Sequence, residues 1–314
     1  MQRPRLHAPL LLASAFACAP GCTNRVVTGP AGPDAGLISD AAAPDDAALD
    51  RDADSPRDAA APDDAALVRD AGSPRDAGPP PAPPGDVHVV ITADNAYSFA
   101  YGDAGRIDTF VRGSRASLAG EIFNCPVGLG PEAYTVPTAA APSGAYLYII
   151  SWDDLSVTQG VLGEFERDGR FVYTGDERFE VCATGIDHAR AAPGIDPING
   201  PTKESVEAEI TRCNEGLGAA GTTSEGWVDL AGAVIAGAVG TLAVGEANEA
   251  APGGEFPPVC SEDPTMGGLG IDAAARWMWY APEGLSGSPF RSTGSNTFRS
   301  YLIFRLPADE INLI

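Results

Sequence analysis

The sequence predicts a mainly β fold, an antiparallel β-sandwich with one short helix, preceded by a disordered linker. The central observation is Tyr146–Trp152 (YLYIISW), where apolar residues occupy both alternating faces. Such a strand needs partners on each side, so we expect it in the middle of a sheet. The second observation is Asp168-Gly169 between two apolar runs, the dipeptide that best accepts the positive φ angles of a type I′ hairpin turn. The third is an Ala/Asp/Pro-rich stretch before residue 86 that contains no aromatic residue.

Residues 1–22 have the pattern of an export signal. Two arginines precede an apolar run, Leu6–Ala17, which is too short for a permanent membrane span. Two cleavage sites compete: an A-x-A site before Cys18, and Ala19–Cys22 (APGC), which resembles a bacterial lipobox although leucine is usual in place of Ala19. We predict lipidation at Cys22 and hence an outer-membrane or cell-surface lipoprotein, with plain secretion as the alternative.

Residues 23–85 are predicted to be a disordered linker. Asp40–Arg57 and Asp58–Arg75 are tandem copies with a period of 18 residues and only two differences. Because this composition cannot bury enough apolar surface to offset chain entropy, we do not expect it to fold. Gly78–Gly85 (GPPPAPPG) adds a semi-rigid polyproline stretch. The segment is therefore interpreted as a stalk, or as a spacer whose length alone matters.

The folded domain is predicted to span residues 86–314 and to consist of short strands. The Asp168-Gly169 turn would place Phe165 opposite Val172 and Glu166 opposite Phe171. A tight turn at 174–176 follows, and we expect the next strand to continue a β-meander. The predicted strands are 87–93, 97–101, 107–111, 116–125, 146–152, 161–167, 170–174, 178–182, 273–281 and 298–306.

The last strand has a clear period of two. Leu302, Phe304 and Leu306 alternate with more polar residues and are predicted to face the core. Arg299 and Arg305 fall on the other face, so we expect them to face water.

A single helix is predicted from 202 to 213, within an insertion at about 186–272. Thr202 or Ser205 would be the N-cap, and Gly216 follows the helix end. One apolar stripe would lie on the sheet, formed by Val206, Ile210, Cys213 and Leu217. Further on, Leu230–Val244 is rich in Gly, Ala and Val, and we expect a pair of small-residue strands or a tight buried segment.

Several of these motifs resemble galactose-binding-like jelly-roll domains of exported bacterial proteins. The similar stretches are ITADNAYSFAYGD at Ile91–Asp103, YLYIISWDD, QGVLGEFERDG, TGDERFEV and AARWMWY. The inserted segment at about 186–272 departs from the family pattern, which leaves the strand order open. The resemblance implies a jelly-roll-like sandwich that binds a ligand rather than catalyses a reaction, without identifying the ligand.

Four cysteines lie in the predicted domain: Cys125, Cys182, Cys213 and Cys260. An even number in an exported chain favours two disulfides, and three connectivities are open. A zinc site has little support, because no C-x-x-C spacing occurs and histidines are few. Cys213 lies on the apolar stripe of the helix, so its bridge would fasten the helix to the sheet.

Charge limits the partners. The chain carries 43 acidic and 20 basic residues, and from residue 86 onward 31 against 13. Nucleic acid and anionic membranes are therefore not expected as partners, and any membrane contact would come from the lipid anchor alone.

Candidate ligand-binding residues gather after two of the strands. Asp94, Asp153 and Asp154 could hold Ca²⁺ at one end of the sandwich, although Asp is also a common turn former. Trp152 could stack on a sugar or lie in the core. Trp277 and Trp279 share one strand face, so that both lie in the core or both form a platform on which a sugar could stack. No other cofactor is expected.

No catalytic motif occurs, and no catalytic residue is assigned. The sequence favours a stalked surface module for binding or adhesion, with a surface glycan or a protein as partner. A secreted hydrolase with unidentified carboxylate catalysts and a structural envelope component are the alternatives.

The anchor can be tested with Cys22→Ser. Removing the thiol removes the acceptor for the lipid, so the variant should leave the membrane fraction and appear in the medium. Fractionation and immunoblotting measure this. If the wild type is already soluble without detergent, cleavage before Cys18 replaces the lipidation prediction.

Overall fold

The computed structural model describes residues 84–94, 96–115, 123, 131–152, 157–187, 195–196, 200–217, 224–249, 253–259, 270–291 and 300–312. The predicted signal segment and all but the last two residues of the predicted linker lie outside the described residues. So do Cys125, Cys260 and the candidate calcium ligands Asp153 and Asp154.

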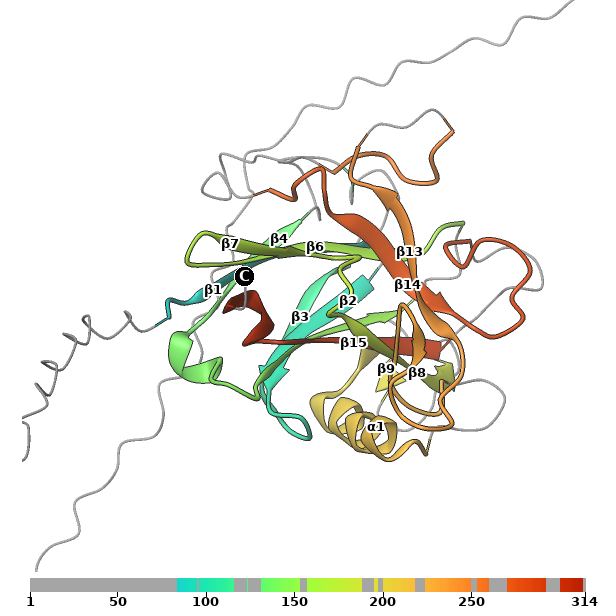
Figure 1. Cartoon of the computed structure of the whole chain (residues 1–314), viewed down its shortest axis with the longest axis horizontal. Helices are drawn as coiled ribbons and strands as arrows, with labels where there is room; N and C mark the ends of the chain where they lie inside the picture. The colour runs from blue at the N-terminus through green and yellow to red at the C-terminus, as the bar shows by residue number, and fades with distance from the viewer. Residues whose placement is uncertain are drawn as a thin grey trace, which may run out of the picture. The chain divides into compact units, whose positions relative to one another are not determined.

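The first sheet contains six strands in the order β13-β14-β6-β1-β4, with β7 paired to β6 (Figure 1). Its paired strands are all antiparallel. The strands are β1 (Val87–Asp94), β4 (Glu132–Val136), β6 (Gly160–Arg167), β7 (Arg170–Tyr173), β13 (Thr241–Ala247) and β14 (Arg276–Ala281).

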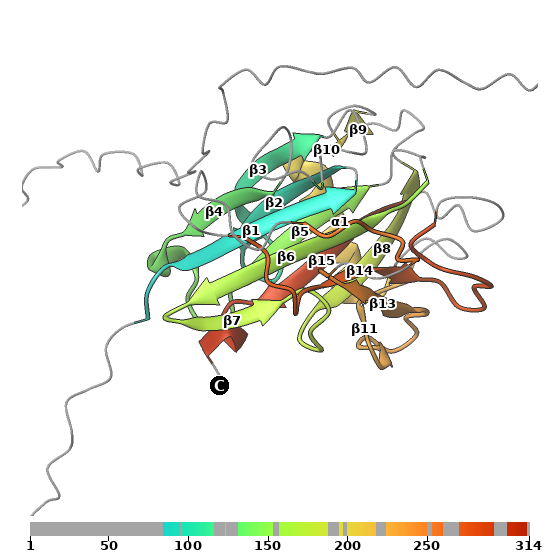
Figure 2. The same cartoon turned by 90° about the horizontal axis from the view of Figure 1, so that it is seen from above.

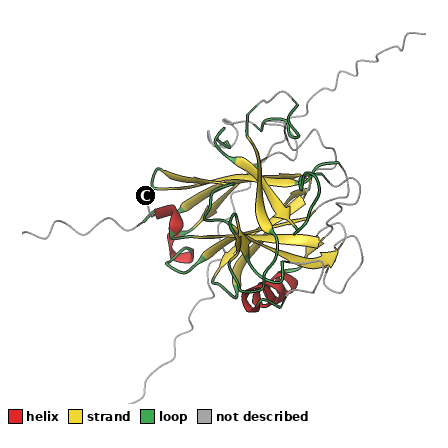
Figure 3. Cartoon of the chain, turned by 45° about the vertical axis from the view of Figure 1, so that its right-hand side comes forward, coloured by secondary structure: helices red, strands yellow, loops and turns green. Residues whose placement is uncertain are grey.

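The second sheet contains seven strands in the order β12-β11-β8-β15-β5-β2-β3, again with antiparallel pairs. The strands are β2 (Ala96–Gly102), β3 (Ile107–Arg115), β5 (Tyr146–Trp152), β8 (Glu180–Asp187), β11 (Val228–Asp229), β12 (Gly232–Ala233) and β15 (Ser300–Pro307). Outside the sheets lie the short pair β9 (Ile195–Asp196) and β10 (Gly200–Pro201), and the 3₁₀ turns η1 (Thr138–Ala140) and η4 (Glu310–Asn312). The predicted fold class is confirmed: two antiparallel sheets and one α-helix among the described residues (Figure 3).

Strand β5 lies in the interior of its sheet, between β15 and β2, as its sequence predicts. Leu147 and Ile149 belong to the core between the sheets. Tyr148 and Ile150 belong to a second core on the opposite face of the sheet, beneath the helix. Both faces of β5 are buried, which explains why its apolar residues do not alternate with polar ones.

The β6–β7 hairpin has the predicted turn and register. Asp168 and Gly169 have φ angles of 54° and 75°. Phe165 pairs with Val172, and Glu166 pairs with Phe171. The turn residues alone specify this geometry, because few other dipeptides accept two positive φ angles.

The predicted β-meander is wrong. β8 does not pair with β7 but crosses to the second sheet, where it lies between β11 and β15. Gly175, with a φ of 88°, turns the chain away, and the amide of Arg276 donates to the carbonyl oxygen of Thr174 at 2.9 Å. Strand β7 pairs only with the second half of β6. Near the start of β6, Val161 pairs instead with Met278 on β14, a strand that is distant in sequence. A turn signal specifies a reversal of the chain but not which strand occupies the next position.

The helix α1 (Lys203–Glu215) has the predicted caps. The side chain of Thr202 accepts a hydrogen bond from the amide of Ser205, and Gly216 ends the helix with a φ of 69°. The residues buried on its apolar stripe include Val206, Ile210 and Cys213. Leu217 does not join the stripe and is 56% exposed, because the left-handed Gly216 directs the chain off the helix axis.

A disulfide joins Cys182 on β8 to Cys213 on α1, with the Cα atoms 6.2 Å apart. It fastens the helix to the second sheet, as predicted for Cys213. Because Cys125 and Cys260 lie outside the described residues, the second predicted bridge stays a prediction.

The prediction that Arg305 faces water is wrong. The residue is only 7% exposed, and its guanidinium lies 3.9 Å from the ring centre of Trp227 and 4.8 Å from that of Tyr146. Its Nε donates to Glu180 Oε2 at 2.6 Å, and its Nη1 donates to Asn214 Oδ1 at 2.9 Å. The face of β15 opposite the intersheet core is covered by α1 and Trp227, so alternation along β15 does not imply exposure. Leu302, Phe304 and Leu306 do face the intersheet core, as predicted.

Loss of the Cys182–Cys213 bridge should lower stability. The bridge closes a sequence separation of 31 residues, and restricting such a loop in the unfolded chain contributes about 3–4 kcal/mol. Cys182→Ala/Cys213→Ala should therefore melt about 10 °C lower than wild type under non-reducing conditions. Differential scanning calorimetry measures this. An unchanged Tm would show that the helix is held by packing alone.

Candidate binding groove

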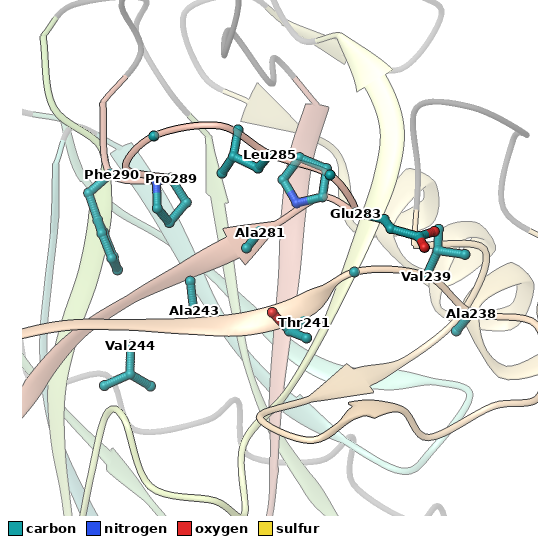
Figure 4. A pocket seen from close by; sticks show the side chains of 14 residues that line it. Ala238, Val239, Thr241, Ala243, Val244, Ala281, Glu283, Leu285, Pro289 and Phe290 are labelled. Atoms are coloured by element: carbon teal, nitrogen blue, oxygen red, sulfur yellow. The ribbon is translucent and has the colours of Figure 1, made fainter.

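An open groove with a volume of about 750 Å³ lies between β13 and the loop that follows β14 (Figure 4). This volume falls within the range of small-molecule and peptide pockets. The lining is mostly small and apolar: Ala238, Val239, Gly240, Thr241, Ala243, Val244, Ala281, Pro282, Glu283, Gly284, Leu285, Gly287, Pro289 and Phe290.

The β13–β14 pairing positions the floor of the groove. Thr241 pairs with Ala281 and Ala243 pairs with Trp279, so Thr241, Ala243 and Ala281 lie on one face of the two strands. In Figure 4 the side chains of Ala243 and Ala281 lie between β13 and the loop. Gly240 must be a glycine: its φ is 85°, and a Cβ there would lie 2.5 Å from the hydroxyl of Tyr280.

The opposite wall is fixed by hydrogen bonds from other parts of the fold. The amide of Gln159 donates to the carbonyl of Phe290 at 3.0 Å, and its side chain donates to the carbonyl of Pro289 at 2.6 Å. Glu255 pairs with Arg291 at 2.9 Å, and the ring of Phe290 meets Phe256 edge to face. These contacts hold the loop in place and so form the groove without a ligand.

The groove carries negative charge at one end. Its one charged lining side chain is Glu283, which is exposed, and the lining contains no lysine or arginine. Burial raises the pKa of Tyr280, and the charges of Glu283 and Glu225 raise it further. The Tyr280 hydroxyl donates to the carbonyl of Val239 in the groove wall at 2.9 Å. The groove therefore favours an apolar or cationic ligand.

The groove lies at the end of the sandwich opposite the attachment of the linker. At the linker end, the carboxylate of Asp168 accepts from the amide of Gly85 at 2.9 Å, and Arg167 Nε donates to the Gly85 carbonyl. At the other end of β6, Gln159 holds the groove loop. A strand of eight residues such as β6 separates the two by roughly 25 Å. Figure 2 shows β6 running from the β14 side of the sheet to the turn into β7.

Trp152 does not offer a face for a sugar. It is 4% exposed, and a Cβ added to Gly200 would lie 2.3 Å from its ring. Trp227, Trp277 and Trp279 are fully buried. The sugar-stacking hypothesis is therefore wrong for Trp152, Trp277 and Trp279, and their placement in the core is confirmed.

Asp94 ends strand β1 and is 1% exposed. Its carboxylate accepts a hydrogen bond from the hydroxyl of Thr158, just before β6. The described residues contain no group of three His, Cys, Asp or Glu side chains arranged for a metal. Because Asp153 and Asp154 lie outside these residues, the calcium site stays a prediction.

A carboxylate cluster lies on the β6–β7 hairpin, apart from the groove lining. Burial raises the pKa of Glu164; a hydrogen bond from the Asp272 amide opposes this shift, and the charges of Asp272 and Glu166 add to it. Tyr173, the partner of Glu164 across the hairpin, also has a raised pKa, because of burial and the charges of Asp272 and Glu164. Among the described residues, this cluster of carboxylates with a raised pKa is the group that the predicted hydrolase alternative could use.

The sequence did not predict the groove. The stretch of sequence that contributes most to the groove is the run Leu230–Val244, which was expected to form paired strands or a buried segment. The run instead divides: β12 joins the second sheet and β13 the first, and Leu230 and Val234 are each 40% exposed. Small residues in a loop-rich segment thus marked a surface and not a core.

No protein-family model matches the chain, and no similar protein is found among curated proteins or solved structures. The resemblance to galactose-binding-like domains therefore stays a prediction. None of the helices in the described part of the chain is long and apolar enough to cross a membrane.

Glu164→Gln tests whether the charge of the partly buried Glu164 destabilises the fold. The raised pKa means that ionised Glu164 destabilises the fold at pH 7, whereas below pH 4.5, its usual pKa, the destabilisation is absent. The amide of Gln keeps the acceptor for the Asp272 amide. We expect a higher Tm for the variant at pH 7, with the difference closing as the pH falls to 4. A lower Tm at pH 7 would show that the charge stabilises the cluster.

Proposed function

We propose that this chain is an exported, lipid-anchored surface protein that presents a β-sandwich binding module on a stalk. The observation that carries the proposal is the position of the groove at the end of the domain remote from Gly85, where the predicted linker joins. A ligand site at that end lies away from the residue where the predicted linker joins the domain.

The predicted linker gives the module reach. A flexible chain the length of residues 23–85 has an end-to-end distance of about 45 Å, and charge repulsion among its aspartates extends it further. The negative charge of the domain itself keeps it away from an anionic membrane surface. Both features support presentation outward from the cell.

The groove supports binding and not catalysis. Its lining holds one hydroxyl, on Thr241, and one carboxylate, on Glu283, with no histidine, cysteine or lysine. A nucleophile with a base to activate it, the requirement for hydrolysis, is not present among these residues. The hydrolase alternative stays a prediction, because the described residues do not cover the whole domain.

A protein is the favoured class of partner over a glycan. Sugar recognition depends on exposed aromatic faces, and the one aromatic ring in the lining, Phe290, is only 5% exposed. Alanine, valine and proline walls suit aliphatic side chains instead.

The groove can be tested by filling it. Ala243→Trp should place a ring over the floor and abolish ligand binding, whereas Ala231→Trp, in the exposed turn before β12, should not. NMR chemical-shift mapping of the full-length Cys22→Ser chain against a panel of peptides and oligosaccharides measures this. We expect shifts in 238–244 and 281–290 only. Shifts confined to another face, or binding unaffected by Ala243→Trp, would contradict the proposed site.

Deleting Asp40–Arg75 separates presentation from binding. The shortened chain should keep its affinity for a soluble ligand in solution but mediate less contact between cells and a coated surface. A flow adhesion assay measures the second quantity. Unchanged adhesion would mean that the stalk has no role in presentation.

A further inference from the structure

Two neighbouring strands of the first sheet connect the point where the predicted linker joins the domain to the groove. Gly85, where the linker joins, lies just before β1 at one end of the sandwich. Gln159, directly before β6, holds the groove loop at the other end. The two strands pair antiparallel over almost their full length. Pulling Gly85 and the groove loop apart therefore pulls β1 and β6 in opposite directions along their own axes.

This geometry loads the hydrogen bonds between β1 and β6 in shear. The hydrogen bonds of an antiparallel pair lie perpendicular to the strands, so a force along the strands acts on the whole set at once. The register from His88↔Glu166 to Asp94↔Gly160 is continuous. Strand β1 is also paired with β4 on its other edge, which adds further bonds to the set. A force that opened the sheet from one end would instead break the bonds one after another.

The start of this path is clamped to other parts of the domain. The amide of Gly85 donates to the carboxylate of Asp168 at 2.9 Å, and the Gly85 carbonyl accepts from Arg167 Nε at 2.9 Å. The amide of Thr138 donates to Asp86 Oδ1 at 2.8 Å. These contacts tie the segment before β1 to the β6–β7 turn and to η1, and so spread a force before it reaches β1.

At the other end of the path, the groove loop is bonded to the start of β6. The amide of Gln159 donates to the carbonyl of Phe290, and its side chain donates to the carbonyl of Pro289. Thr158 forms an antiparallel bridge with Arg291. Strand β14, which leads into the loop, also pairs antiparallel with β6. A ligand in the groove would therefore pull on β6 from its first residue.

We propose that the β1–β6 pair carries tension in shear between the predicted linker and a ligand held in the groove. This inference rests on the proposed function, because tension arises only when an anchored domain holds a target.

The test compares two directions of pulling on the full-length Cys22→Ser chain in optical tweezers. One handle is at the amino terminus. The other is either at the carboxyl terminus or on a peptide tag inserted after Gly284 in the groove loop, where an added Cβ would meet no described atom within 4 Å. Ala308, after β15, lies beside Gly85, because Arg167 donates to both carbonyls. Pulling through the carboxyl terminus therefore opens the domain from a single end.

At equal loading rates, pulling through the groove loop should need a several-fold larger unfolding force than pulling through the carboxyl terminus. Forced unfolding is governed by the unfolding rate, and only the first direction requires the β1–β6 bonds to break together. The Tm of each tagged chain, compared with the untagged chain, checks that the tag leaves the fold intact.

Gln159→Leu tests whether the force enters through β6. The substitution keeps a side chain of similar size and removes the side-chain bond to Pro289. The unfolding force should fall in the groove-loop direction only, since a general loss of stability would lower it in both. Glu255→Ala, which releases the same loop from Arg291 but not from β6, should change neither force. The two directions can be compared without any substitution, so they decide the inference even if Gln159→Leu does not fold.

Equal forces in the two directions, or a larger force through the carboxyl terminus, would overturn the inference. If ligands of the peptide and oligosaccharide panel still map to the groove, the binding function stands without it. If no panel ligand shifts residues 238–244 or 281–290, the proposed function fails, and the inference fails with it because the groove then transmits no tension.

Discussion

The attachment of the inserted segment to the second sheet is the constraint on which the groove depends. Arg305 lies between the rings of Trp227 and Tyr146, and its charge is paired with Glu180 on β8. Removing one partner of a buried pair costs about 3–5 kcal/mol, because the other charge is left buried. Trp227 in turn donates to Asn214 on α1 at 2.7 Å. One arginine thus joins β15, β8, α1 and the segment that leads into β13.

Local signals predicted local structure well. The Asp168-Gly169 turn and the Thr202 cap act within a few residues, so the sequence alone determines them. Errors arose where distant segments compete. The turn after β7 could not show that β14 occupies the next position on β6, and the alternation along β15 could not show that α1 and Trp227 cover Arg305. Both outcomes depend on packing between residues far apart in the chain.

The site was harder to predict than the fold for a related reason. Tryptophan and aspartate were the natural candidates, yet in a two-sheet domain with a second core beneath α1 the large aromatic residues are needed to fill the interior. The groove is instead lined mostly by small apolar residues, and its wall is held by contacts with distant segments, such as the hydrogen bond from Gln159 to a loop 130 residues away. Small apolar residues form no recognisable sequence motif, because such a surface is specified by its backbone and shape and not by particular side chains.

The groove and the disulfide are linked through α1. Gly216, which ends the helix, lies close to Glu225 and Ile235, so a Cβ there would come within 3.2 Å of the Glu225 carbonyl. From there the chain runs through Ala238 into the groove wall and β13. Because Cys182–Cys213 holds the same helix to the second sheet, the bridge supports the base of the wall. The bridge acts together with the hydrogen bonds that Asn214 on α1 accepts from Trp227 and Arg305. The bridge itself requires oxidation of the two thiols, a condition that export to an oxidising compartment would supply.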